Sequence, residues 1–294
     1  MPQNELTETD LYELEAVVGK ALKTRDESAL NIVGHGEISV ALGWPIDNPT
    51  HVCKRSPPFT QQQFNAYQQL VSEYVGKVEA AGLAVADTTI TPLTRGDKIV
   101  CYLVQPLLET STLGHNVLKA SEPDPDHPFL VALAESLNLV TPDLSIDAQV
   151  TNFSWDQSKL TLVDVGTPFM WDGNGKIRVD MAPFSRMLPA PTRWLAVREL
   201  TKLVTRWNEP RSVGVDIVAN LYREGLEEWV DPTVIALNRM LGSHNLITAA
   251  EGLSYFQEDA KLWPALKRAQ RVERWWQTSV RRRPYDWFIH TSFG

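Results

Sequence analysis

Apolar residues in the first half of the chain alternate between helical spacing and short runs. Residues 8–23 have a helical spacing and predict a leading helix. Residues 29–55 carry three short apolar runs divided by glycines and a Pro/Asn-rich turn, which predicts three antiparallel strands. Helical spacing returns over 60–82, and two further strands are expected at 87–93 and 98–107. The first half is therefore predicted to be mostly sheet with one main helix.

Helical spacing dominates after residue 110. Short strands are expected only around 151–155 and 160–164. This polarity predicts an α+β fold with two lobes and a cleft between them, joined by the apolar connector after the last strand of the first half. The expected helices lie at 128–140, 192–207, 213–228, 232–241 and 258–280. The predicted division is a leading helix at 1–28, a sheet lobe at 29–109 and a helical lobe at 110–294.

Charge and cysteine content narrow the class of protein. The 28 Lys and Arg against 36 Asp and Glu give a formal charge of −8, which opposes broad attraction to nucleic acid or anionic lipid. Cys53 and Cys101 are too few for a disulfide framework, and the N-terminus is acidic without a following apolar run. No stretch approaches 18 uninterrupted apolar residues. We expect a reduced, cytoplasmic protein with no membrane span and no nucleic-acid partner.

The strongest motif lies in residues 144–168. Asp147 precedes Asn152 by five positions, and Asp164 opens an Asp-Val-Gly triplet after a short apolar run. This segment resembles the catalytic segment of the protein-kinase-like superfamily, in which an Asp and an Asn share one loop and a second Asp follows a strand. The resemblance implies that Asp147 is the base that orients an attacking hydroxyl. It also implies that Asn152 and Asp164 are hard oxygen ligands for Mg²⁺.

Residues further upstream extend the resemblance in the right order. Gly34 and Gly36 resemble the glycine-rich hairpin over the ATP phosphates, with Ser39 where a third glycine is common. Lys54 lies on the next predicted strand, and Glu73 follows 19 residues later in the predicted helix. The resemblance implies a Lys54–Glu73 ion pair at the α- and β-phosphates of ATP.

The implied architecture is the two-lobed protein-kinase-like fold, with an antiparallel N-lobe sheet, one main helix and a mostly α-helical C-lobe. Backbone groups from Gln105 to Leu107, in the connector, are then expected at the adenine. The chain is most similar in style to aminoglycoside phosphotransferase and choline kinase-like small-molecule kinases. The function implied is ATP- and Mg²⁺-dependent phosphorylation of a hydroxyl on a small molecule.

Several positions depart from the superfamily pattern. Ser145 stands two before Asp147, where a histidine is usual, and Gln149 stands where Ser/Thr protein kinases carry lysine. The Ala-Pro-Glu element that follows a peptide-docking segment is missing. Two alternatives therefore stay open: a pseudokinase that binds without turnover, and an enzyme of the same fold that transfers a nucleotidyl or phosphoryl group to protein. The motifs specify neither the acceptor nor the oligomeric state.

The C-terminal stretch combines arginines with tryptophans. Arg271, Arg274 and residues 281–283 surround Trp275, Trp276 and Trp287. We expect the aromatic side chains to pack on the protein body and the arginines to face water, with contact to an anionic substrate or partner as the alternative. Trp171, just beyond the Asp-Val-Gly triplet, is the tryptophan expected near a substrate.

Overall fold

A five-stranded antiparallel sheet forms the first half of the protein. The computed structural model describes residues 6–35, 39–156, 158–243 and 245–289. The strand order is β1-β2-β3-β6-β5, so the consecutive strands pair as hairpins except where β6 inserts beside β3. All five strands were expected from the sequence. Their bounds are Ile32–His35 (β1), Val40–Trp44 (β2), His51–Arg55 (β3), Thr89–Arg95 (β5) and Lys98–Pro106 (β6).

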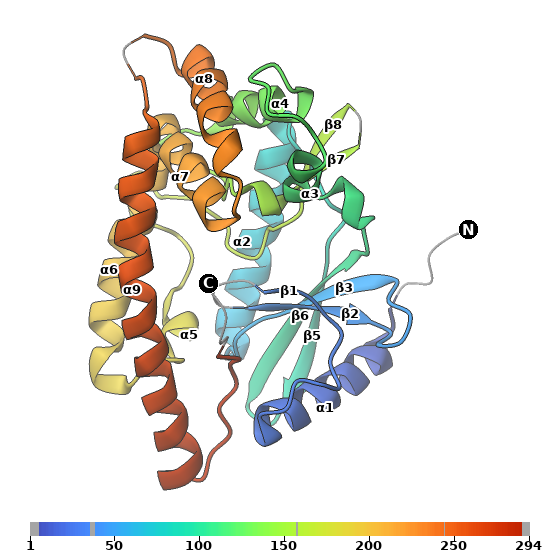
Figure 1. Cartoon of the computed structure of the whole chain (residues 1–294). Helices are drawn as coiled ribbons and strands as arrows, with labels where there is room; N and C mark the ends of the chain where they lie inside the picture. The colour runs from blue at the N-terminus through green and yellow to red at the C-terminus, as the bar shows by residue number, and fades with distance from the viewer. Residues whose placement is uncertain (1–5, 36–38, 157, 244, 290–294) are drawn as a thin grey trace.

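One long helix covers each face of this sheet. Helix α1 (Glu8–Thr24) packs Leu11, Leu14 and Val18 against one face, and α2 (Gln61–Ala80) packs on the other (Figure 1). Both helices begin with a capping box, in which a threonine side chain accepts a hydrogen bond from the third helical amide. The leading helix is thus an integral layer of the sheet unit, because it shares a core cluster with the strands.

A small second sheet connects the two halves. Its order is β4-β8-β7, with β4 (Ala84–Val85) parallel to β8 (Lys159–Leu162) and β7 (Phe153–Asp156) antiparallel to β8. The strands β7 and β8 agree with the predicted pieces, whereas β4 is too short to give a sequence signal. Because β4 comes from the first half and β8 from the second, the sheet fixes the segment before Asp164 to the first half.

Helices make up most of the second half (Figure 1). The longest, α9, begins nine residues before the predicted start, because Thr248 and Glu251 form a capping box there. None of the helices in the described ranges is long and apolar enough to cross a membrane. The helices are α3 (Gly114–Lys119), α4 (Pro128–Ser136), α5 (Ala182–Ser185), α6 (Arg193–Thr205), α7 (Pro210–Arg223), α8 (Val230–Leu241) and α9 (Ala249–Trp275), followed by a π-helical turn at Trp276–Val280.

The main hydrophobic core runs through both halves. It includes Phe64 and Tyr74 of α2, Leu103 of β6, Phe153 of β7 and Ile217 of α7. The fold is therefore α+β, with its sheet and helices segregated as predicted. The boundary drawn at residues 109 and 110 separates regions of different secondary structure that share this core.

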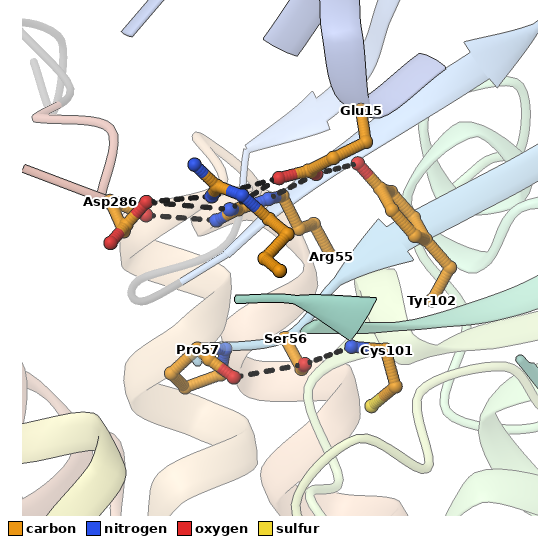
Figure 2. A network of polar contacts seen from close by, with 8 residues as sticks. Glu15, Arg55, Ser56, Pro57, Cys101, Tyr102 and Asp286 are labelled. Atoms are coloured by element: carbon orange, nitrogen blue, oxygen red, sulfur yellow. Dashed lines mark hydrogen bonds and ion pairs between the residues drawn. The ribbon is translucent and has the colours of Figure 1, made fainter. Parts of the chain in front are cut away.

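A buried polar network ties α1 and the C-terminal segment to β3 (Figure 2). The Arg55 guanidinium donates to both carboxylate oxygens of Glu15, at 2.8 and 2.9 Å, and to the Asp286 carbonyl at 2.9 Å. The Tyr102 hydroxyl donates to Glu15 at 2.7 Å, and Arg95 bridges Glu15 and Asp286. Arg55 is adjacent to Lys54 on the same strand, so the network also anchors the strand that carries Lys54.

Replacing Glu15 by glutamine is expected to lower the free energy of unfolding by about 3–5 kcal/mol at neutral pH, because it removes the counter-charge of a buried arginine. Burial alone would raise the pKa of Glu15, but Arg55 outweighs it and lowers that pKa. Because the pKa of Glu15 is lower in the folded protein than its ordinary value of 4.5, the ionised carboxylate stabilises the protein at pH values above 4.5. This stabilisation is lost as the pH falls below 4.5 and through the folded-state pKa.

Denaturant unfolding as a function of pH measures this effect. The difference between the wild type and Glu15→Gln should therefore shrink in acid. Glu13→Gln, on an exposed position of the same helix, is the matched control. Equal stability of the two variants at neutral pH would contradict the assignment.

Candidate functional site

Lys54 points away from α1 because side chains alternate along β3. Cys53 and Arg55 face α1, with Cys53 in the cluster on that side of the sheet and Arg55 on Glu15. Lys54 therefore lies on the opposite face, where its Nζ forms an ion pair with Oδ2 of Asp164. The two side chains are 27% and 26% exposed, so a ligand can reach the pair. The alternation along β3 thus directs Lys54 toward Asp164, which lies 110 positions further along the chain, and the two side chains share one site.

Backbone pairing brings the Asp147 loop beside the segment that follows Asp164. The Ser145 amide donates to the Phe169 carbonyl at 2.9 Å, and the Trp171 amide donates to the Asp143 carbonyl at 3.1 Å. Ile146 and Ala148 are each 1% exposed, so they fix the loop in the core on both sides of Asp147. Asp147 is consequently held near Asp164, and the charge of Asp164 contributes to its raised pKa.

Asp147 and Asn152 leave the same short loop. The Asn152 side-chain amide donates to the Asp147 carbonyl at 3.2 Å, and the Asn152 carbonyl accepts from the Val163 amide at 2.8 Å. Oδ1 of Asp147 is buried and has no hydrogen-bond partner. Burial and the neighbouring Asp164 raise the pKa of Asp147 from 3.8 to about 6. The loop therefore holds a buried carboxylate oxygen for which the described residues supply no hydrogen-bond partner, and a ligand would reach it only after the atoms that cover it move.

Asp164 is held by one cation and one backbone amide. Its Oδ2 pairs with Lys54, and its Oδ1 accepts from the Gly166 amide at 2.9 Å. Burial would raise the pKa of Asp164, but Lys54 and the Gly166 amide lower it, so Asp164 stays ionised at lower pH than Asp147 does. A Cβ on Gly166 would lie 3.2 Å from Asp164 Oδ1 and 3.5 Å from Lys54 Nζ. A Cβ at this position would be close enough to the Asp164 carboxylate that the carboxylate would have to shift by a few tenths of an ångström.

Two tyrosines of α2 complete the site, and neither was predicted as a site residue. The Tyr67 hydroxyl donates to the Gly166 carbonyl at 2.8 Å. Tyr74 is 1% exposed, and the charges of Asp147 and Asp164 contribute to raising its pKa after burial. Tyr67 also lines a cavity of about 340 Å³ between α2 and residues 178–180. Their helical spacing predicted both tyrosines as core positions, and it carried no signal of the polar contact.

Replacing Tyr67 by phenylalanine is expected to lower the free energy of unfolding by about 1–2 kcal/mol, because the buried Gly166 carbonyl loses its partner. The ring contacts stay, since phenylalanine keeps the shape that stacks on Phe59 at 5.0 Å between centroids. Denaturant unfolding measures the change. A variant as stable as the wild type would show that the hydroxyl does not hold the Asp-Val-Gly turn.

The predicted Lys54–Glu73 ion pair is not the arrangement in the structure. Lys54 pairs with Asp164, whereas Glu73 accepts two hydrogen bonds from the Arg178 guanidinium, both 2.7 Å, and pairs with Lys77. These bonds lower the pKa of Glu73 to about 2. The reason lies in the register of α2, which turns Tyr67 and Tyr74 toward the site and Glu73 toward residue 178.

The other nucleotide-binding predictions fall on the sheet and the connector. Gly34 pairs with Ala41 in the β1–β2 hairpin, and Gly36 lies outside the described residues. The Leu107 amide donates to the Thr50 carbonyl at 2.9 Å, so in this structure that N–H is already engaged. The Gln105 side chain donates to Thr88 at 2.8 Å and to the Val163 carbonyl at 2.7 Å. Adenine contact stays a prediction for the remaining backbone groups of this stretch.

Two single residues beside the site, Ser145 and Trp171, are buried. Ser145, in the place of the usual histidine, is fully buried, and its hydroxyl has no partner, but its amide still holds the loop. Trp171, which was expected near a substrate, is 3% exposed and belongs to the main core, and its contact with a substrate stays a prediction.

The described residues contain no group of three or more His, Cys, Asp and Glu side chains placed to hold a metal ion. The site itself supplies two carboxylates and the Asn152 amide. Such a set is typical of Mg²⁺ sites that take their other ligands from phosphates and water.

The fold and the site define an α+β protein with a lysine, two aspartates and an asparagine gathered where its sheet meets its helices. The sequence profile of DUF6206, a family of unknown function, matches residues 13–274, so the chain belongs to this family. No curated protein matches it.

Proposed function

We propose that this protein transfers the γ-phosphoryl group of ATP to a hydroxyl of a small molecule. The observation that carries the proposal is that three segments of the chain bring Lys54, Asp147, Asn152 and Asp164 to one site. One Asp147 oxygen there has no hydrogen-bond partner among the described residues. Chemistry in phosphoryl transfer depends on positioning and charge, which these four residue types supply. A protein-kinase-like architecture is part of the same proposal.

The residues fit Mg²⁺ and a nucleotide. The unpartnered Asp147 oxygen, the Asn152 side chain and Asp164 offer hard oxygen atoms, and the raised pKa of Asp147 reports a carboxylate whose charge has too little compensation. A divalent cation would supply that compensation and neutralise phosphate charge. Asn152 and Asp164 would hold it, and Lys54, which now pairs with Asp164, would turn to the phosphates.

Asp147 is then the residue that binds and orients the hydroxyl of the acceptor molecule. Its carboxylate accepts the hydrogen bond of the attacking hydroxyl and orients the oxygen toward the γ-phosphorus. As the oxygen–phosphorus bond forms, the bond to the β-phosphate oxygen breaks and the hydroxyl proton passes to the carboxylate. The products are ADP and a phosphate monoester.

A nucleotide-binding module without turnover is the second candidate. The structure favours it in one respect, because Lys54 and Glu73 each have another partner in place of their expected pair. A transferase of nucleotides to protein is the third reading, and no specific contact favours it.

Incubation with Mg²⁺, a metabolite extract and ATP labelled on either the γ- or the α-phosphate separates these readings. The proposal predicts γ-label in a small molecule and none in the Asp147→Asn variant. Label from the α-phosphate in protein would support nucleotidyl transfer. ATP binding without transfer of either label would support the binding module.

A further inference from the structure

The end of α9 exposes tryptophans that we expected to be packed. Trp275 is 57% exposed and Trp276 is 45% exposed, and Trp194 at the start of α6 is 65% exposed. Tryptophan is a highly buried residue type on average, so three exposed indoles on one side of a protein call for an explanation. The expectation that this stretch packs its aromatic side chains on the protein body is wrong for Trp275 and Trp276.

These side chains belong to one surface. The Arg193 guanidinium donates to Glu273 at 2.9 Å, which places the first turn of α6 against the last turns of α9. A π-helical turn at Trp276–Val280 extends the end of α9, and the Arg281 amide closes it by donating to the Trp276 carbonyl at 3.0 Å. We name this the Trp–Arg surface. It consists of Trp194, Leu195, Arg271, Val272, Trp275, Trp276, Val280, Arg281, Arg282 and Arg283, all exposed.

The helix that carries this surface is firmly held on its other side. Glu273 and Gln270 are buried, and Leu266 and Ala269 pack against a small core that contains Met187 and Tyr285. The Gln277 side chain also donates to Glu273 at 2.6 Å. The exposed side is therefore a fixed feature of the folded protein. In Figure 1 the last turns of α9 form the outermost end of the molecule, past α6 and α1.

Positive charge is concentrated on this surface. Arg281, Arg282 and Arg283 are consecutive and exposed, although the whole chain carries a formal charge of −8. Burial and the nearby Arg25 and Arg271 lower the pKa of Arg274 on the same helix turn, and Tyr285 and Glu27 oppose them only in part. Cations that repel one another at the edge of an acidic protein favour an anionic partner.

We propose that the Trp–Arg surface binds the surface of an anionic phospholipid bilayer. Indole rings and arginines are the side chains that settle at the boundary between head groups and acyl chains, the arginines on the phosphates and the indoles below them. The aliphatic side chains of Leu195, Val272 and Val280 gain from burial in acyl chains, whereas they have no counterpart in phosphate contacts or base stacking on a nucleic acid. A second copy is disfavoured because a symmetric contact brings the same arginines together.

Cosedimentation of the full chain with vesicles tests the proposal. Vesicles of phosphatidylcholine alone are compared with vesicles that also contain phosphatidylglycerol. We expect binding only to the anionic vesicles, with affinity falling as salt rises. Trp275→Ala with Trp276→Ala should lower the partition constant at least roughly tenfold, because the apolar contact is lost. Their unfolding temperature should stay unchanged, since both side chains are exposed.

Charge reversal has a matched control. Arg281→Glu with Arg282→Glu should abolish binding, because each cation near an anionic surface strengthens it by roughly fivefold. Lys119→Glu with Lys159→Glu makes the same charge change on exposed positions of α3 and β8, at the opposite end of the molecule, and should leave most of the binding (Figure 1). Equal binding to both kinds of vesicle would overturn the proposal. Equal weakening of vesicle binding by the Arg281/Arg282 and the Lys119/Lys159 double variants would also overturn it. The same holds if the wild type binds no vesicles but self-associates or binds an oligonucleotide, and the tryptophan variant loses that association.

Discussion

Asp147→Asn is expected to lower kcat on the order of 10²-fold or more, with little change in ATP affinity. The substitution keeps the size of the side chain and much of its hydrogen bonding but removes the negative charge that orients the acceptor hydroxyl. Steady-state kinetics with the acceptor and direct ATP titration measure the two quantities separately. If ATP binding fell as much as turnover, Asp147 would be a metal or structural residue.

The same substitution is expected to stabilise the protein without ligands by about 1–3 kcal/mol, because it removes a half-buried charge that faces Asp164. The folded-state pKa of Asp147, about 6, lies above its ordinary value of 3.8, so the ionised form costs stability at neutral pH. The gain should be full above pH 6 and shrink as the pH falls toward 4. Denaturant unfolding at several pH values measures it. A destabilised variant at neutral pH would mean that the carboxylate has a partner in the folded protein.

Asp164→Asn is expected to abolish Mg²⁺-dependent turnover and to leave thermal unfolding nearly unchanged. The variant loses a charged metal ligand, and no core volume is emptied. Its ion pair with Lys54 is about a quarter exposed, and the charge of Asp147 still compensates Lys54 in the variant, so the loss of that pair costs about 1 kcal/mol. Turnover measured across a range of Mg²⁺ concentrations, together with thermal unfolding, tests both expectations.

The two aspartate variants should therefore differ in their effect on the stability of the protein. Asp147→Asn should be more stable than the wild type, and Asp164→Asn should be equal or slightly less stable, although both lose turnover. Comparable turnover of Asp164→Asn with Mg²⁺ would remove Asp164 from the metal site. Asn152→Asp offers a further control, because it adds a charge to the same loop and should raise the Mg²⁺ affinity.

Local patterns were sufficient to predict most of the sheet and helices. Alternation along residues 51–55 places Lys54 on the opposite face of the sheet from Cys53 and Arg55. The pair Thr60 and Gln63 marks the start of α2. The short strand β4 escaped prediction because two residues carry no periodicity. Its pairing with β8 is a contact across the chain that only the folded structure specifies.

The candidate site was predictable in its residue types and less so in its pairings. Lys54, Asp147, Asn152 and Asp164 do meet, as their order along the chain suggested. The partner of Lys54 was wrong, because the rotation of α2 is set by how its apolar face packs, and a one-residue difference in that rotation exchanges Glu73 for Tyr74. The role of Tyr67 was likewise hidden, since a buried tyrosine in a helix looks the same whether or not its hydroxyl binds a distant carbonyl.

Calorimetric titration of ATP into the wild-type protein, with and without Mg²⁺, tests the central claim most directly. The account predicts saturable binding that needs Mg²⁺, with a Kd between about 1 μM and 1 mM. Lys54→Met should weaken it at least roughly tenfold, because its ammonium binds the phosphates, whereas Lys98→Met at the start of β6 should have no effect. No binding of ATP in the presence of Mg²⁺, or binding that Lys54→Met leaves unchanged, would contradict the account.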